Sequence, residues 1–136
     1  DKYISLDNNQ IVFPETNVSK LTIALKEKLN NNNQLTFIGP DENRLPNNLS
    51  FVCHTSTKQP IKGRDVVREL SKRNVFVSSG SACSSSYNSS NPILSAINVD
   101  YCYRDSGLRI TLGKWNNTND INIASKIISD SLNYLQ

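Results

Sequence analysis

The sequence lacks methionine altogether and holds one histidine, one tryptophan and few aromatic residues, 7% of its 136 positions. No run of about 18 apolar residues occurs, so we expect no transmembrane helix. No leader with a charged start and an apolar middle is visible, so we expect no signal peptide. Because the chain starts at Asp1, we interpret it as a processed product or an expressed fragment. Its length fits one domain with a core of its own.

The cysteines form no metal-binding or disulfide pattern. Cys53, Cys83 and Cys102 are separated by 30 and 19 positions, include no C-x-x-C pair and are accompanied only by His54. We therefore expect no zinc site. An odd number of cysteines without a leader indicates free thiols in a reducing compartment, which we take to be the cytoplasm. Cys53 is predicted to be a packed core thiol and His54 a residue at a strand edge, whereas Cys102 is ambiguous.

The charge pattern excludes little. The net charge is +3 with both signs interspersed, which is a weak indication of acidic partners. No dense cluster of Lys and Arg with interleaved aromatics occurs, so nucleic-acid binding is unsupported. The phosphate-binding patterns G-x-x-x-x-G-K-[ST] and G-x-G-x-x-G are both absent, so no phosphate cradle is predicted.

Helical and strand patterns alternate along the chain. Apolar periodicity predicts helices at 21–29, 64–73, 91–98 and 118–136, and strands at 35–39, 49–55, 75–77 and 108–112. Asn91 and Pro92 are expected to start the third helix, and Thr118 or Asn119 to cap the last. Asn74 and Asn98 follow helices where a left-handed residue is favoured. The order predicts an α/β fold of two layers, with a small mixed or antiparallel sheet covered by helices on one face.

We expect residues 1–136 to form a single domain, with an N-terminal tail at 1–17 and a mobile, cysteine-bearing loop at 78–90. This loop, SSGSACSSSYNSS, has no periodicity, so Cys83 should be accessible to solvent. Free cysteine is usually buried in folded chains, and long loops inside compact domains are often functional. Two interpretations stand: a flexible linker with an incidental thiol, or an arm that carries one.

Arg109 lies in the alternating segment LRITL. Successive side chains of a strand point to opposite faces. Leu108, Ile110 and Leu112 should therefore meet the helices, and Arg109 should point out from the uncovered face. A guanidinium group is suited to a bidentate grip on a carboxylate. The alternative is an ordinary solvated surface arginine.

Four segments taken together resemble a known family. They are RLPNNLSF at 44–51, VFVSSGSACSSS at 75–86, NPILSAIN at 91–98 and LRITLGKWNNTNDIN at 108–122. In order and spacing they are similar to the C-terminal small domain of NifS/IscS-type cysteine desulfurases, which are class-V, fold-type I pyridoxal-phosphate enzymes. The resemblance covers most of residues 20–136. It departs from the family at Asn74 and Asn98, where glycine is usual.

The resemblance implies roles for individual residues. Cys83 matches the catalytic cysteine, whose thiolate takes the sulfur of L-cysteine as a persulfide and leaves L-alanine. Arg109 matches the arginine that binds the substrate carboxylate. The implied mobile loop carries Ser78, Ser79, Gly80, Ser81, Ala82, Ser84 and Ser85. The implied partners are L-cysteine and a sulfur-acceptor protein such as an iron–sulfur scaffold, and a homodimer stays open.

The resemblance also shows what this chain does not contain. The family's cofactor-binding lysine follows a histidine, and no such pair occurs here. We therefore expect that the 136 residues alone neither bind pyridoxal phosphate nor turn over L-cysteine. The chain is then either part of a cysteine desulfurase or a free-standing protein without the cofactor domain. The second would act as a sulfur carrier or as a module that binds protein or nucleic acid.

Overall fold

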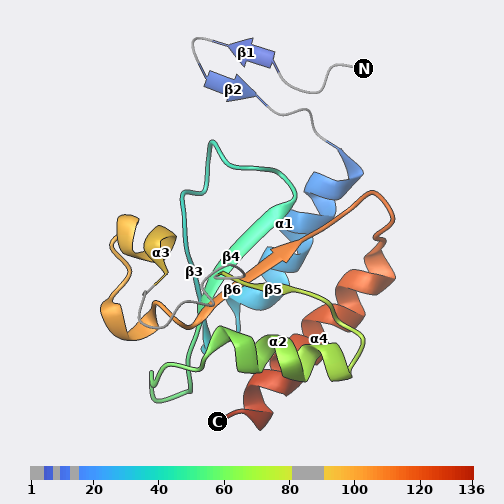
Figure 1. The fold of residues 1–136 in the computed structure, drawn as a ribbon. Coiled ribbons are helices and arrows are strands. Elements are labelled where there is room, and N and C mark those ends of the chain that lie inside the picture. Colours follow the sequence, from blue (N-terminus) through green and yellow to red (C-terminus); the bar gives the residue numbers. More distant parts are fainter. Residues whose placement is uncertain (1–4, 8–9, 13–15, 81–90) are drawn as a thin grey trace.

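The computed structural model describes residues 5–7, 10–12, 16–80 and 91–136 (Figure 1). The main sheet has four strands, all antiparallel, in the order β3-β4-β6-β5. Their bounds are Leu35–Phe37 for β3, Asn48–Cys53 for β4, Ser78–Ser79 for β5 and Gly107–Thr111 for β6. A separate two-stranded ribbon pairs β1, Ser5–Asp7, with β2, Gln10–Val12.

The register of the sheet decides which side chains share a face. Phe51 of β4 lies opposite Leu108 of β6, and Ser50 lies opposite Arg109. Ser78 of β5 lies opposite Arg109 from the other side. Since neighbouring side chains alternate, Phe51 and Leu108 face one layer while Ser50, Ser78 and Arg109 share the opposite face.

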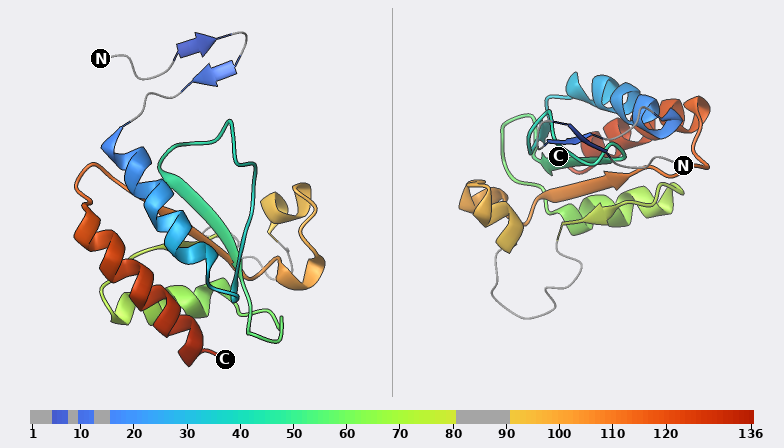
Figure 2. Two further views of the ribbon diagram at one scale, coloured as in Figure 1. Left: turned by 180° about the vertical axis from the view of Figure 1, so that it is seen from behind. Right: turned by 90° about the horizontal axis from the view of Figure 1, so that it is seen from above.

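Three helices bury their apolar residues against the first of these faces. They are α1, Asn17–Asn30; α2, Gly63–Lys72; and α4, Thr118–Tyr134. Leu25, Leu70 and Ile128, one from each helix, are almost completely buried in one cluster with Phe51 and Leu108. Figure 2 shows α1 and α4 side by side, and α2 contacts β5 and β6. The predicted α/β fold, with helices covering one face of the sheet, is confirmed.

A shorter pair of elements lies apart from these helices. The helix α3 spans Pro92–Ala96, and a 3-10 turn follows at Tyr101–Tyr103 (Figure 1). Leu94 of α3 is buried, whereas Ile93 is 64% exposed. The helix α3 therefore has one apolar side chain packed into the protein and another exposed to solvent.

Local sequence explains how the helices begin and end. Asn91 caps α3 as predicted, its Oδ1 accepting hydrogen bonds from the amides of Ile93 and Leu94. Asn74 and Asn98 adopt the predicted left-handed conformation, with φ of 60° and 58°. The predicted cap of the last helix was wrong by one or two residues. Asn117 caps α4, because its side chain accepts from the amide of Asp120 while Asp120 accepts from the amide of Asn117.

Residues 75–77 were predicted as a strand and form none. The amide of Val75 donates to the carbonyl of Leu70, so this residue closes α2 rather than joining the sheet. Val75 and Val77 still pack against the core, while Phe76 between them is 79% exposed. Pairing with the sheet starts only at Ser78.

His54, which was expected at a strand edge, directly follows the last residue of β4 and is buried, with 2% of its surface exposed. Its Nδ1 lies 3.0 Å from the carbonyl oxygen of Thr55, and its Nε2 lies 2.9 Å from the Thr36 hydroxyl. The Lys58 ammonium approaches the same Nε2 at 3.3 Å. These partners make burial of the imidazole tolerable, because buried polar groups require hydrogen bonds.

The start of α2 is pressed against β6. The amide of Gly63 donates to the carbonyl of Asp105 at 2.8 Å. A Cβ atom placed on Gly63 would lie 2.1 Å from the carbonyl oxygen of Gly107. Only glycine fits at this position, since no side chain can share that space.

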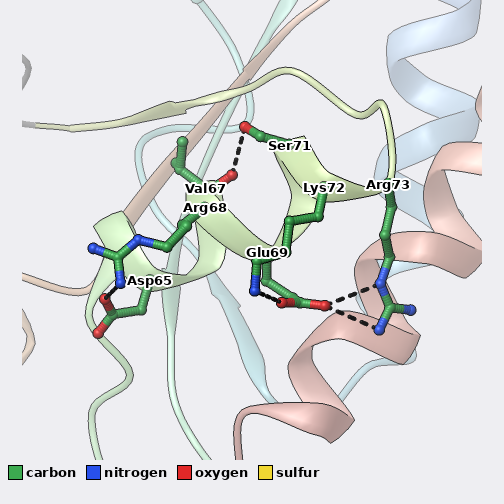
Figure 3. Close-up of polar contacts among 7 residues, drawn as sticks. All are labelled: Asp65, Val67, Arg68, Glu69, Ser71, Lys72 and Arg73. Atoms are coloured by element: carbon green, nitrogen blue, oxygen red, sulfur yellow. Dashed lines mark hydrogen bonds and ion pairs between the residues drawn. The ribbon is translucent and has the colours of Figure 1, made fainter.

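The carboxylate of Glu69 organises the far end of α2 (Figure 3). It accepts from Lys72 Nζ at 3.0 Å and from Arg73 Nε at 3.2 Å. The hydrogen bond from Lys72 is the main reason that the pKa of Glu69 falls below its ordinary value, and Arg73 acts in the same direction. Residue 69 is buried, so this carboxylate lies under its two cationic partners.

Replacing Glu69 by Gln should lower the free energy of unfolding near neutral pH, because both cations lose their counter-charge. The folded chain lowers the pKa of Glu69 from 4.5. The stabilisation is therefore complete above that pH and is lost as the pH falls through the folded pKa. Urea unfolding at neutral and acid pH should show the difference between the two proteins shrinking under acid conditions. The control Glu27→Gln, at an exposed position of α1, should change stability little; a pH-independent difference for Glu69→Gln would contradict this account.

Candidate functional site

A pocket of about 230 Å³ opens on the face of the sheet that α1, α2 and α4 leave uncovered. Its walls come from β4, β6, the segment 38–45 and α3. Ser50 and Arg109 contribute polar groups, Leu45 and Ile93 contribute exposed apolar surface, and Gly80 and Asn91 line it from the β5 and α3 sides. A small concave site with apolar walls and few polar groups is typical of ligand binding.

Arg109 is exposed and makes no ion pair or hydrogen bond with any residue that the structure describes. Its neighbours across the sheet, Ser50 and Ser78, are small and uncharged. The prediction that Arg109 points out from the uncovered face is thus confirmed. Within the described part of the chain, no acceptor engages the N–H donors of its guanidinium group.

Arg44, which also lines the pocket, is in a different situation. Its Nη1 donates to the carbonyl of Pro40 and its Nη2 to the carbonyl of Asn48, at 3.0 and 2.8 Å. Its guanidinium carbon lies 4.5 Å from the centre of the Phe37 ring. Partial burial lowers the pKa of Arg44, against the opposing effect of Asp41. Arg44 is therefore held in the wall by these contacts, whereas Arg109 has no such partner among the described residues.

Gly80 and Asn91, which flank the segment 81–90 in the sequence, both line this pocket. The amide of Gly80 donates to the carbonyl of Gly107 at 3.3 Å. A Cβ atom on Gly80 would lie 2.7 Å from Nδ2 of Asn91. The two residues that flank the segment are therefore in contact, although ten residues separate them in the sequence. The sequence pattern predicted Asn91 only as a helix cap, and no feature of the neighbouring residues predicts its contact with Gly80.

Cys83 lies outside the described residues, as do Ser81, Ala82, Ser84 and Ser85, whereas Ser78 and Ser79 form β5. In the sequence, Cys83 follows Gly80, which lines the pocket, by three residues.

The other two cysteines have different environments. Cys53 is fully buried in the core as predicted, and burial raises the pKa of its thiol to about 12. Cys102 is exposed on the 3-10 turn. Neither lines the pocket.

The described residues do not fit pyridoxal phosphate. A cofactor of this kind is held through a lysine amine, and buried surroundings are what make such an amine reactive. None of the eight lysines in the described part of the chain is buried, and none lines the pocket. The pocket offers a site for an anion but no amine.

Comparison with known proteins gives matches in both sequence and fold. The sequence model of the aminotransferase class-V family matches residues 6–123. A curated relative, the cysteine desulfurase IscS of Dictyoglomus turgidum, is 37% identical over 90 residues, covering 66% of this chain and 22% of the relative. The chain therefore belongs to the class-V aminotransferase family.

Solved structures point to the same branch of that family. A NifS-like protein superposes with a TM-score of 0.69 at 27% identity, over 87% of this chain and 28% of its own. A NifS-like protein from Rickettsia africae has the same TM-score at 20% identity, over 85% and 28%, and supports the fold alone. The chain thus spans about a quarter of the length of these relatives. Within the described residues, no helix is both long and apolar enough to cross a membrane.

The two described thiols should differ sharply in reactivity. In a Cys83→Ser background, N-ethylmaleimide at neutral pH should modify Cys102 and spare Cys53, because only the thiolate reacts and burial disfavours it. Intact mass should show one adduct on the folded chain and two in concentrated urea. Two adducts on the folded chain would contradict the burial of Cys53.

Proposed function

We propose that this chain acts as the small domain of a cysteine desulfurase, with Cys83 as the sulfur-accepting thiol and Arg109 as the anchor of the substrate carboxylate. The observation that carries the proposal is the pocket itself. It combines an arginine without a partner among the described residues with Gly80, three residues before Cys83. Family membership and the IscS relative make L-cysteine the substrate that this pairing would serve.

Arg109 suits the carboxylate of an amino acid. Its guanidinium group offers a planar pair of donors, and a carboxylate matches that pair with two oxygens. The pocket lies on a sheet face where Ser50 and Ser78 leave room above the arginine. No acidic residue lines it, so the anion meets no like charge there.

The proposed chemistry at Cys83 is a transfer of one sulfur atom. The carbon–sulfur bond of L-cysteine breaks, a sulfur–sulfur bond forms at the Cys83 thiolate, and the substrate keeps its own thiol proton as it becomes L-alanine. Cys83 ends as a persulfide, which a second thiolate can attack. Both steps need reduced cysteine, which fits a reducing compartment.

The electron-withdrawing chemistry of this family depends on pyridoxal phosphate, and we infer that this chain does not hold it alone. The described lysines are unsuitable, as shown above. The sulfur-accepting role thus requires a second, cofactor-bearing part, whether on a longer polypeptide or on a separate protein. The sulfur acceptor would be a thiol-bearing protein such as an iron–sulfur scaffold.

Sulfur transfer can be read directly by mass. The chain incubated with L-cysteine, pyridoxal phosphate and a catalytic amount of an intact cysteine desulfurase should gain about 32 Da, one sulfur atom, on the Cys83 peptide. Cys83→Ser should lose the adduct and Cys102→Ser should keep it. Omitting the desulfurase should abolish it. An adduct without the desulfurase would overturn the inference about the cofactor, and no adduct on Cys83 would sink the sulfur-accepting role.

Carboxylate binding at Arg109 can be tested separately. In a ¹⁵N-labelled chain, L-alanine should shift the Arg109 Nε–H resonance, whereas L-alaninamide, which lacks the carboxylate, should bind about tenfold more weakly. Arg104 is a matched internal control, because its Nε already donates to the carbonyl of Val99 at 3.0 Å. Equal shifts with both ligands, or an equal shift at Arg104, would show that Arg109 is not a carboxylate anchor.

A further inference from the structure

Although charges of both signs are interspersed along the chain, one segment carries an excess of positive charge. Residues 58–73 hold six of the 15 Lys and Arg residues and only two of the 12 Asp and Glu. The segment therefore has a net charge of +4, and the remainder of the chain has a net charge of −1. The tertiary structure turns this segment into an exposed loop followed by α2.

Three of these cations form a line on α2. Arg64, Arg68 and Lys72 follow one another at intervals of four residues, which places them on one side of a helix. All three are exposed. We call this row the basic stripe of α2. From Arg64 to Lys72 it is about 12 Å long, at 1.5 Å per residue.

The acidic residues of α2 do not cancel the stripe at its surface. The Lys72 side chain is 63% exposed, and that of its partner Glu69 is only 9% exposed. The Arg68 side chain is 71% exposed, against 40% for Asp65. Figure 3 shows both carboxylates paired with these cations. A molecule that approaches α2 therefore meets the cationic groups first.

The stripe begins beside the candidate site. Gly63, the first residue of α2, lies against the carbonyl of Gly107, and the amide of Gly80 donates to that same carbonyl. Arg64 directly follows Gly63. The chain therefore enters the segment that carries Cys83 next to the start of the basic stripe.

We propose that the basic stripe of α2 is the docking surface for an acidic protein that receives sulfur from Cys83. This rests on the proposed sulfur-accepting role of Cys83. Complementary charge speeds encounter and sets orientation, and the closeness of Gly63 to Gly80 would bring the bound partner to the thiol. The helix GRDVVRELSK contains no aromatic residue on which a base could stack, which favours an acidic protein surface over nucleic acid.

The transfer step is a thiol–persulfide exchange. A thiolate of the acidic partner attacks the outer sulfur of the Cys83 persulfide. A new sulfur–sulfur bond forms on the partner, the bond to Cys83 Sγ breaks, and Cys83 leaves as a thiolate. No oxidant or reductant is consumed.

The test uses the full chain as a Cys102→Ser variant, with Cys83 loaded by inorganic polysulfide. The probes are two labelled peptides of equal length, each with one cysteine, one rich in Glu and one rich in Lys, together with an oligo-dT strand. Fluorescence anisotropy measures binding, and mass spectrometry measures sulfur transfer. At low salt the Glu-rich peptide should bind, and should accept sulfur, about tenfold better than the Lys-rich peptide, and added salt should remove the advantage.

The stripe is tested by reversing its charge. Arg64→Glu with Arg68→Glu should weaken binding of the Glu-rich peptide about tenfold. Lys28→Glu with Lys126→Glu changes the net charge equally at exposed positions of α1 and α4 and should weaken it less than about threefold. The milder pair Arg64→Gln with Arg68→Gln should give an intermediate loss of binding of the Glu-rich peptide. It keeps the test decisive if the charge-reversed variant misfolds.

The outcomes separate the two proposals. If the control pair weakens binding as much as the stripe pair, net charge alone explains it and the docking surface is refuted. Tighter, stripe-dependent binding of oligo-dT would assign the surface to nucleic acid instead. If stripe-dependent binding of the Glu-rich peptide persists but the loaded chain transfers no sulfur, the docking surface stands and the role of Cys83 falls.

Discussion

The carbonyl of Gly107 is the contact on which the arrangement of this molecule depends. It accepts the amide of Gly80, and it lies so close to Gly63 that a Cβ atom there would approach within 2.1 Å. The start of α2, the end of β5 and the start of β6 therefore meet at one backbone group. Because each of the three segments contributes a glycine, the backbones approach more closely than side chains would allow.

This contact joins segments that contribute to the core, to the pocket and to the basic surface of α2. Beyond Gly107, the alternation of β6 sends Leu108 into the core and Arg109 into the pocket. Before Gly80, α2 runs along the sheet edge with its cations outward; after it, the chain enters the segment of Cys83. The pocket that Arg109 lines and the start of the basic stripe of α2 thus lie on either side of the same backbone contact.

The two arginines of the pocket show how environment, and not residue type, separates structure from function. The guanidinium group of Arg44 donates hydrogen bonds to the carbonyls of Pro40 and Asn48 and lies over the ring of Phe37. Arg109 has no such partner among the described residues. The matched part of this chain covers 22% of the IscS relative and 28% of the NifS-like structure. In the proposed function, this chain supplies Arg109 and Cys83, and a second, cofactor-bearing part supplies the amine.

Much of this was readable in the sequence because it depends on local chemistry. Period-two alternation put Arg109 on the uncovered face, helical spacing found three of the four helices to within a few residues, and asparagine marked the left-handed ends at Asn74 and Asn98. Local rules failed where distant contacts decide. The burial of His54 depends on Thr36, and Val75 is taken from the sheet by the carbonyl of Leu70.

The amino-acid sequence by itself determined most of the elements and the family resemblance, and that resemblance implied the candidate roles of Cys83 and Arg109. Only the tertiary structure decided that Gly80 touches Asn91, that Arg109 lies in a pocket with them, and that the basic stripe starts beside Gly107. The physical reason is that these contacts join residues far apart in the chain. Close approach of glycine backbones and pairing of β5 with β6 create them, and no local pattern encodes either one.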